Sequence, residues 1–146
     1  MSFGGENSGD STQPELDRLL DSALALARQR LAAASDFEPF AIFADSNSRV
    51  MAMDWDTAPL GKHPEIDQIL GAAVVALRHV RDSAQCTALV VNTHLSKEKT
   101  DALEVRLEHR HGTSVVVFLP YKRAKFGNHV DFGDMKAYNG KQTVWI

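Results

Sequence analysis

The chain has 146 residues, of which 44% are hydrophobic and 24% are charged, and its net charge is -3 at pH 7. This length and composition fit one globular domain that buries its core without a disulfide bond or a structural metal. The one cysteine, Cys86, excludes an internal disulfide bond, and no signal peptide or membrane span is evident, so we expect a cytoplasmic protein. Residues 94–146 hold 9 basic and 6 acidic side chains, an excess too small and too dispersed to indicate nucleic-acid binding.

The first predicted element is a helix that follows a polar lead. Residues 1–11 are rich in Gly, Ser and Asn, which predicts a disordered N-terminal lead, and residues 12–146 then form a single α+β domain. Thr12 and Glu15 have the spacing of a capping box, so we expect a helix from about Pro14 to Ala34. Its apolar residues recur at helical spacing, at Leu16, Leu19, Leu20, Ala23, Ala27 and Leu31.

A strand pair and a second helix follow. The strands are predicted at Phe40 to Phe43 and Arg49 to Trp55, around a polar turn. Pro64 suits the first position of the second helix. The second strand places Met51, Met53 and Trp55 on one face, which we interpret as core packing rather than a ligand-binding stripe.

The rest of the chain has the pattern of strands. Residues 86–93 are mostly apolar, residues 103–107 alternate apolar with charged, and residues 115–119 are apolar on both faces. A further strand is expected at about residues 129–132. Asn139-Gly140 then predicts a hairpin between residues 135–138 and 143–146. The fold class is therefore α+β, with a mainly antiparallel sheet of 5–7 strands in the order α-β-β-α-β-β-β-β(-β).

This order resembles the roadblock and profilin-like folds, in which an antiparallel sheet carries helices on both sides. The resemblance covers about residues 14–120 and is topological. It implies that the strands at 40–43 and 115–119 are central and apolar on both faces, while the strand at 103–107 has one wet face. This sequence differs from the roadblock pattern at the C-terminus, where the roadblock pattern has a helix and this chain has the pattern of a hairpin.

Three sequence segments also resemble a group of small uncharacterised bacterial proteins. These segments are Pro39-Phe40-Ala41, residues 101–112 and Leu119-Pro120-Tyr121. The resemblance implies a bacterial source, but it implies no activity and transfers no catalytic residue.

Four sets of residues are candidates for chemistry, and two of them lie on or near the charged strand. His109 and His111, with His94 or His129, do not have the spacing of a compact zinc site. Glu104 and Glu108 lie about 13 Å apart along an ideal strand, too far for a pair of hydrolytic carboxylates. We interpret them, with Arg106 and Arg110, as a solvated face.

The other two sets are also weak candidates for a catalytic or metal site. Cys86 has no basic activator nearby in sequence, which favours a buried apolar role. The pairs Asp54 with Asp56 and Asp131 with Asp134 lack the glycine-anchored spacing of a calcium loop. The sequence therefore predicts no catalytic residue, no metal site and no cofactor, and we lean towards a protein that is not an enzyme.

The leading functional hypothesis is a protein–protein interaction module. A basic loop with aromatic neighbours is the best candidate for binding an acidic protein partner: Tyr121, Lys122, Arg123, Lys125 and Phe126. Trp145 lies on the predicted C-terminal edge strand, where its apolar side chain has to be shielded from water. A second copy of the chain could shield it, which suggests a homodimer. The alternative is a small enzyme or ligand-binding protein with a pocket near Asp54, Trp55, His63 and Tyr121.

Overall fold

The computed structural model describes residues 11–127 and 129–146, so residues 1–10 of the predicted lead lie outside the described residues. The described chain has the predicted order of elements. The helices are α1 (Thr12–Ala33), the 3-10 turn η1 (Ala58–Leu60) and α2 (Ile66–Val80). The strands are β1 (Phe40–Asp45), β2 (Val50–Met53), β3 (Ala84–Leu95), β4 (Thr100–His109), β5 (Ser114–Arg123), β6 (Val130–Phe132) and β7 (Lys136–Asn139).

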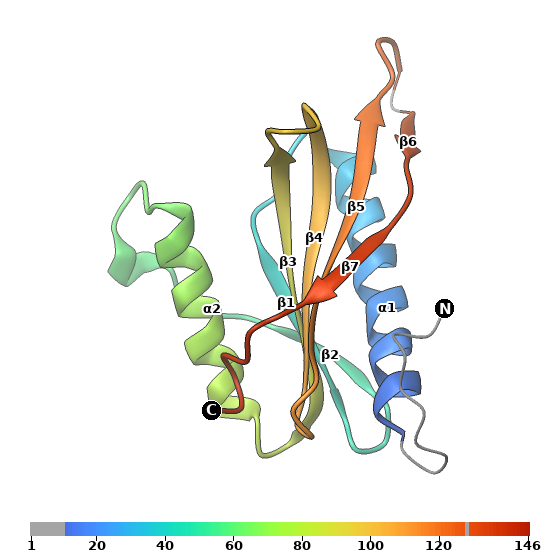
Figure 1. The fold of residues 1–146 in the computed structure, drawn as a ribbon. Helices are drawn as coiled ribbons and strands as arrows, with labels where there is room; N and C mark the ends of the chain where they lie inside the picture. The colour runs from blue at the N-terminus through green and yellow to red at the C-terminus, as the bar shows by residue number, and fades with distance from the viewer. Residues whose placement is uncertain (1–10, 128) are drawn as a thin grey trace.

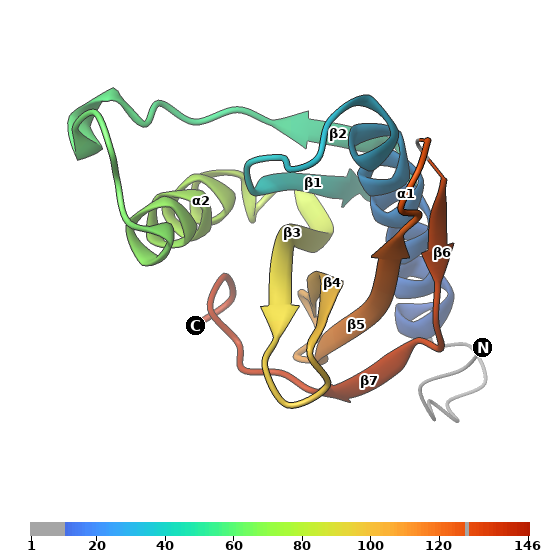
Figure 2. The same ribbon diagram turned by 90° about the horizontal axis from the view of Figure 1, so that it is seen from above.

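The strands form one antiparallel, curled sheet with a helix on each face (Figures 1 and 2). The strand order is β2-β1-β3-β4-β5-β6, and β7 also pairs with β5. β6 pairs with the last residues of β5 and β7 with its first half, so the two short strands share one edge. This arrangement confirms the predicted α+β class with a mainly antiparallel sheet.

The centre of the sheet differs from the one that the roadblock resemblance implies. β1 pairs with β3, with Ala41 opposite Leu89, and β4 separates β3 from β5. The reason is that tight turns join β3 to β4 and β4 to β5, so each strand pairs with the one before it. β3 and β4 are therefore central, and the strand at 115–119 lies towards the β6/β7 edge.

α1 covers one face of the sheet and forms the larger core. The helix contributes Leu16, Leu19, Leu20, Ala23, Leu24, Ala27 and Leu31, which pack on β1, β3, β4 and β5. The predicted capping box at Thr12 does not form, because Ser11 is the N-cap residue and no side-chain cap bond is made. The Glu15 carboxylate instead accepts a hydrogen bond from the Ser11 hydroxyl and contacts a histidine described below.

α2 covers part of the opposite face and forms a second core. The helix begins at Ile66 rather than at Pro64, because Glu65 and Gln68 form the capping box at its start. The buried residues of α2 are Leu70, Ala73 and Leu77, which pack against β1 and β3. Val144 from the end of the chain completes this core.

The predicted C-terminal hairpin is wrong. β7 pairs with β5, and the Gly140 N–H group donates a hydrogen bond to the Ser114 carbonyl at 2.9 Å. After Gly140 the chain leaves the sheet and crosses to α2 (Figure 1). A Cβ atom at Gly140 would lie 2.7 Å from Ser114 Oγ, so glycine permits the close approach of β7 and β5 rather than a hairpin turn.

None of the helices among the described residues is long and apolar enough to span a membrane.

Candidate functional site

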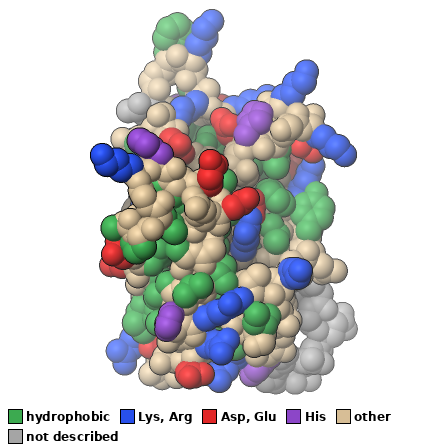
Figure 3. Space-filling model, turned by 90° about the vertical axis from the view of Figure 1, so that its left-hand side faces the viewer, with side chains coloured by type: hydrophobic (Ala, Val, Ile, Leu, Met, Phe, Trp, Pro, Cys, Tyr) green, Lys and Arg blue, Asp and Glu red, His purple; other side chains and the backbone are tan. Residues whose placement is uncertain are grey.

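A cleft of about 530 Å³ opens on the α2 side of the sheet. It exists because α2 lies over β1 and β3, while no helix of the described residues lies above the same face of β4 and β5 (Figure 1). Figure 3 shows this side of the molecule, where hydrophobic side chains lie next to charged side chains of both signs. The apolar residues that line the cleft are Val74, Leu77, Leu89, Val116, Phe118, Tyr138 and Val144.

Charged residues of β4 cross the floor of this cleft between apolar neighbours. Arg106 lies opposite Leu89 of β3 and Val116 of β5, and Glu104 lies opposite Phe118. Arg106 Nε donates a hydrogen bond to the Glu104 carboxylate. The Glu104 side chain is 13% exposed and the Arg106 side chain 45%, so the guanidinium is the more open of the two groups. Around Glu104 and Arg106, the face of β4 that was predicted to be solvated is therefore the floor of a half-enclosed cleft.

The third charged residue on this face, Glu108, is buried, which corrects the prediction that it faces solvent. Its carboxylate accepts hydrogen bonds of 2.9–3.2 Å from the backbone N–H groups of Thr143, Val144 and Trp145. The Thr143 hydroxyl donates a further bond at 3.3 Å. Hydrogen bonds to an ionised acceptor are the stronger kind, so Glu108 anchors the end of the chain on the sheet.

The C-terminal segment, residues 141–146, forms the end wall of the cleft through Lys141, Thr143 and Val144. Arg78 of α2 and Arg81, the residue that follows this helix, hold it from the other side. Arg78 Nε donates to the Thr143 carbonyl at 2.7 Å, and Arg81 Nη1 donates to the Val144 carbonyl at 3.0 Å. The segment is thus bound through its backbone N–H groups by β4 and through its carbonyl groups by α2.

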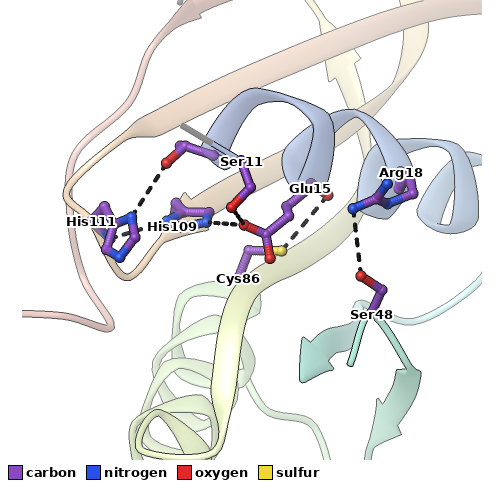
Figure 4. Close-up of polar contacts among 8 residues, drawn as sticks. Ser11, Glu15, Arg18, Ser48, Cys86, His109 and His111 are labelled. Carbon is purple, nitrogen blue, oxygen red and sulfur yellow. Dashed lines mark hydrogen bonds and ion pairs between the residues drawn. The ribbon is translucent and has the colours of Figure 1, made fainter. Parts of the chain in front are cut away.

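A second polar cluster lies on the α1 side, where the start of α1 meets the turn between β4 and β5 (Figure 4). His109 is fully buried, and its Nε2 atom lies 3.2 Å from the Glu15 carboxylate. The backbone N–H of His111 donates to His109 Nδ1 at 3.1 Å. Because Nδ1 accepts this bond, Nε2 carries the proton and donates it to Glu15.

This cluster does not have the geometry of a nucleophile and its base. Cys86 lies directly opposite His109 on β3, but both ring nitrogens of the histidine are engaged elsewhere. The thiol donates to the Glu15 carbonyl at 3.8 Å. Burial, and to a smaller extent the Glu15 charge, raises the pKa of the Cys86 thiol from 9.0 to about 12, so the reactive thiolate is suppressed at neutral pH.

The histidines that were candidates for a metal site do not assemble into one. His94 pairs with Asp101 at 2.9 Å and His129 pairs with Asp131 at 2.7 Å, on separate parts of the sheet. Within residues 11–127 and 129–146, no group of three His, Cys, Asp or Glu side chains could hold a metal ion.

Of the predicted partner-binding residues, Tyr121 and Arg123 are tied into the fold. The Tyr121 hydroxyl donates to Asn92 Oδ1 at 2.6 Å, and burial is the main cause of a raised pKa for this phenol. Arg123 donates to the Ala34 carbonyl at 2.9 Å. These two side chains hold α1 and β3 against β5.

Lys122, Lys125 and Phe126 are exposed, and Phe126 is 84% exposed. The turn that carries Lys125 and Phe126 projects beyond the rest of the sheet between β5 and β6 (Figure 1). Trp145 is far from this turn, because it lies with the C-terminal segment beside α2 and packs on the second core. The six predicted residues therefore belong to two separate regions.

The alternative pocket near Asp54, Trp55, His63 and Tyr121 is not assembled. Trp55 packs against the α2-side core and Tyr121 belongs to the α1-side core, so the sheet lies between them. Asp54 and His63 are exposed.

Sequence reasoning did not find the cleft, although one signal for it was present. Val116 and Phe118 are apolar residues on the second face of β5, which indicates a strand covered on both sides. In the structure α1 covers one face and the cleft lies over the other. A group of apolar residues that faces an open hollow is a common feature of ligand-binding surfaces.

The described residues thus form an antiparallel α+β fold with a largely apolar hollow beside α2. No family model, no curated protein and no solved structure matches this chain.

Proposed function

We propose that this is a non-enzymatic binding protein that holds a small, largely apolar ligand in the cleft between α2 and β7. The observation that carries the proposal is the 530 Å³ hollow with its apolar lining, which has the size and character of small-molecule sites. Its charged groups are gathered on β4 and the C-terminal segment.

Burial of apolar surface supplies the driving force for such binding. Val116 and Phe118 are half-buried, and the Phe118 ring meets the exposed Tyr138 ring edge-on at 5.9 Å. A ligand that covers these side chains gains about 25 cal/mol for each Å² of apolar surface removed from water. Each of the two rings also offers an apolar surface to an alkyl chain or a ring.

The polar groups near the cleft favour binding over catalysis. Glu104 and Arg106 pair with each other, and the Glu108 carboxylate is taken by backbone N–H groups. A base or a nucleophile aimed at a bound molecule would need a free lone pair directed into the hollow.

The proposal is tested by filling the cleft. The uncharged fluorescent probe N-phenyl-1-naphthylamine is expected to bind the wild-type protein saturably, and Val116→Trp is expected to weaken that binding about tenfold by occupying the space. The matched control is Val75→Trp on the outward face of α2, where the native side chain is 50% exposed, and it should leave the affinity unchanged. Equal affinity of wild type and a folded Val116→Trp variant would show that the probe does not occupy the cleft, and would overturn the proposal.

A second candidate function, as a protein–protein interaction module for an acidic partner, is favoured by the projecting turn. Phe126 at this turn is exposed beside Lys122 and Lys125. An exposed aromatic residue flanked by cations is typical of an interaction anchor. The homodimer hypothesis loses its original argument, because the edge strand on which it placed Trp145 does not form.

The candidate is tested with an acidic polypeptide. Lys122→Ala, Lys125→Ala and Phe126→Ala combined should reduce salt-dependent retention of the protein on immobilised polyglutamate several-fold. The control changes Lys62 and Lys97 to Ala, which removes the same charge from exposed positions elsewhere. Identical elution of the two variants would exclude a role for the turn in binding acidic chains.

A further inference from the structure

We propose that the ligand of the cleft is an organic acid, with its carboxylate between Arg106 and Lys141 and its apolar body against Val116, Phe118 and Tyr138. This inference rests on the proposed function and adds the chemical class of the ligand. It follows from the balance of charge inside the cleft.

The acidic groups of the cleft already accept hydrogen bonds. Glu104 is bonded by Arg106 Nε, and the carboxylate of Glu108, below the end wall, is bonded by three successive backbone N–H groups. A cationic ligand would compete with Arg106 for Glu104 and with the backbone N–H groups for Glu108, because each acid holds a charge-assisted interaction in a poorly solvated site.

The basic groups are more open. Arg106 uses Nε for Glu104, and its side chain is 45% exposed against 13% for Glu104, so the guanidinium is the charged group that faces an incoming molecule. Lys141 lines the same cleft from the end wall and is exposed. Lys136 lies opposite Phe118 on β7 and adds a positive charge to the strand that borders the cleft. These groups attract an anion and repel a cation.

The polar and apolar parts of the cleft are arranged for an amphiphilic acid. Arg106 lies in the same cross-strand row as Leu89, Val116 and Tyr138, so a carboxylate on the guanidinium leaves the body of the molecule over apolar side chains. Ser114 and Asn139 also line the hollow and offer further donors. Arginine suits this role because its planar group can bind a carboxylate through two parallel hydrogen bonds.

The experiment compares three ten-carbon probes that differ only in the head group. Decanoate, decan-1-ol and decylammonium are titrated into the protein by calorimetry at neutral pH, below the concentrations at which they form micelles. Decanoate is expected to bind about tenfold more tightly than decan-1-ol and decylammonium to bind weakest.

Two variants separate the head-group inference from a change in folding. Arg106→Gln combined with Lys141→Gln should remove the preference for decanoate and leave decan-1-ol binding within about twofold, and Glu104→Gln alone should strengthen decanoate binding several-fold. Lys62→Gln combined with Lys97→Gln, at exposed positions outside the cleft, is the control for the loss of two positive charges.

The outcomes separate the acid inference from the proposed function. If decan-1-ol or decylammonium binds as tightly as decanoate, or if the double variant keeps the preference, the acid inference is wrong while the cleft remains a ligand site. If none of the three probes binds, and Val116→Trp leaves the affinity for the neutral naphthylamine probe unchanged, the proposed function fails as well.

Discussion

Glu108 shows how a side chain with an ordinary sequence context acquires a structural role. Three successive backbone N–H groups converge on its buried carboxylate, and that bonding is the main polar attachment of residues 143–145 to the sheet. Alternation along β4 predicts correctly that Glu104, Arg106 and Glu108 share a face. It does not reveal what lies above that face, because the partner of Glu108 is 35–37 residues away in the sequence.

Glu108→Gln is expected to loosen the C-terminal segment. The amide keeps one acceptor oxygen but presents an NH2 group to N–H donors, so we expect a loss of about 2 kcal/mol in unfolding free energy. Hydrogen exchange at the amides of residues 143–145 should accelerate, whereas Glu104→Gln, which changes the same charge on the same strand, should not affect those amides. Unchanged exchange in Glu108→Gln would contradict the anchoring role.

Cys86 gives a prediction for reactivity. With a pKa raised from 9.0 to about 12, its thiolate fraction at pH 8 is about a thousandfold smaller than that of an ordinary thiol. Iodoacetamide should therefore label the folded protein slowly and the urea-unfolded protein at the ordinary rate. Rapid labelling of the folded protein would show that the thiol is more accessible than the structure indicates.

The same group makes stability depend on alkaline pH. Well below pH 9.0 the thiol is protonated in both states, so it contributes no pH dependence there. Between pH 9.0 and about 12 the unfolded chain releases the proton and the folded chain keeps it, so the unfolding free energy falls as pH rises. The raised pKa of Tyr121 acts in the same direction. The slope of the urea midpoint over this range should become shallower in Cys86→Ala, and an unchanged slope would argue against the thiol as its source.

At the scale of elements, periodicity predicts the helices and most strands because each of them has one face against a core. The bodies of α1 and α2 and the strands β1, β3, β4 and β5 follow from apolar spacing. The starts of the two helices differ from the predicted ones, because the capping box at Thr12 does not form and Glu65 with Gln68 caps α2. The end of the chain is different: Asn139-Gly140 has the local pattern of a hairpin turn, but β7 pairs with β5 and the following residues bind Glu108. Competition between a local turn and distant partners cannot be read from the turn residues alone.

Gly140 and Gly71 form a matched pair for testing the packing of β7. In Gly140→Ala the new Cβ would lie 2.7 Å from Ser114 Oγ and 3.2 Å from the Val115 nitrogen, so β7 must shift. We expect a loss of about 1–2 kcal/mol. Gly71 is exposed within α2, and a Cβ atom added there would meet nothing within 4 Å, so Gly71→Ala should instead stabilise the protein by up to about 1 kcal/mol. Thermal unfolding of both variants checks that the two changes in stability have opposite signs. If Gly71→Ala destabilises the protein as much as Gly140→Ala does, the steric explanation is ruled out.

At the scale of the whole molecule, the α+β class and the order of elements are predictable, while the neighbours within the sheet and the site are not. The roadblock resemblance implies a central strand at 115–119, but the hairpin connections from β3 to β5 place that strand nearer the edge. The cleft depends on where α2 lies across the sheet and on where residues 141–146 return to it. Both are long-range features that no local pattern encodes.

Removal of residues 141–146 tests the division of the molecule into two cores. The truncated protein loses Val144 and the bonds from Arg78 and Arg81, so amide exchange in α2 should accelerate by about an order of magnitude or more. Exchange in α1 should change little, since its core lies on the other face of the sheet. A uniform acceleration across both helices would indicate one cooperative unit instead.

The path of the chain also sets an order of assembly during translation. α1 and the strands that it covers are complete once Arg123 has been made, so the first core can form at that stage. α2 is synthesised early. Arg78 and Arg81 can form their hydrogen bonds only after the carbonyl groups of Thr143 and Val144, 63–65 residues further along the chain, have been made. Until then its apolar face and the floor of the cleft are open to solvent or to a chaperone, so a chain that ends between Arg123 and Lys141 should expose the floor of the cleft without its end wall.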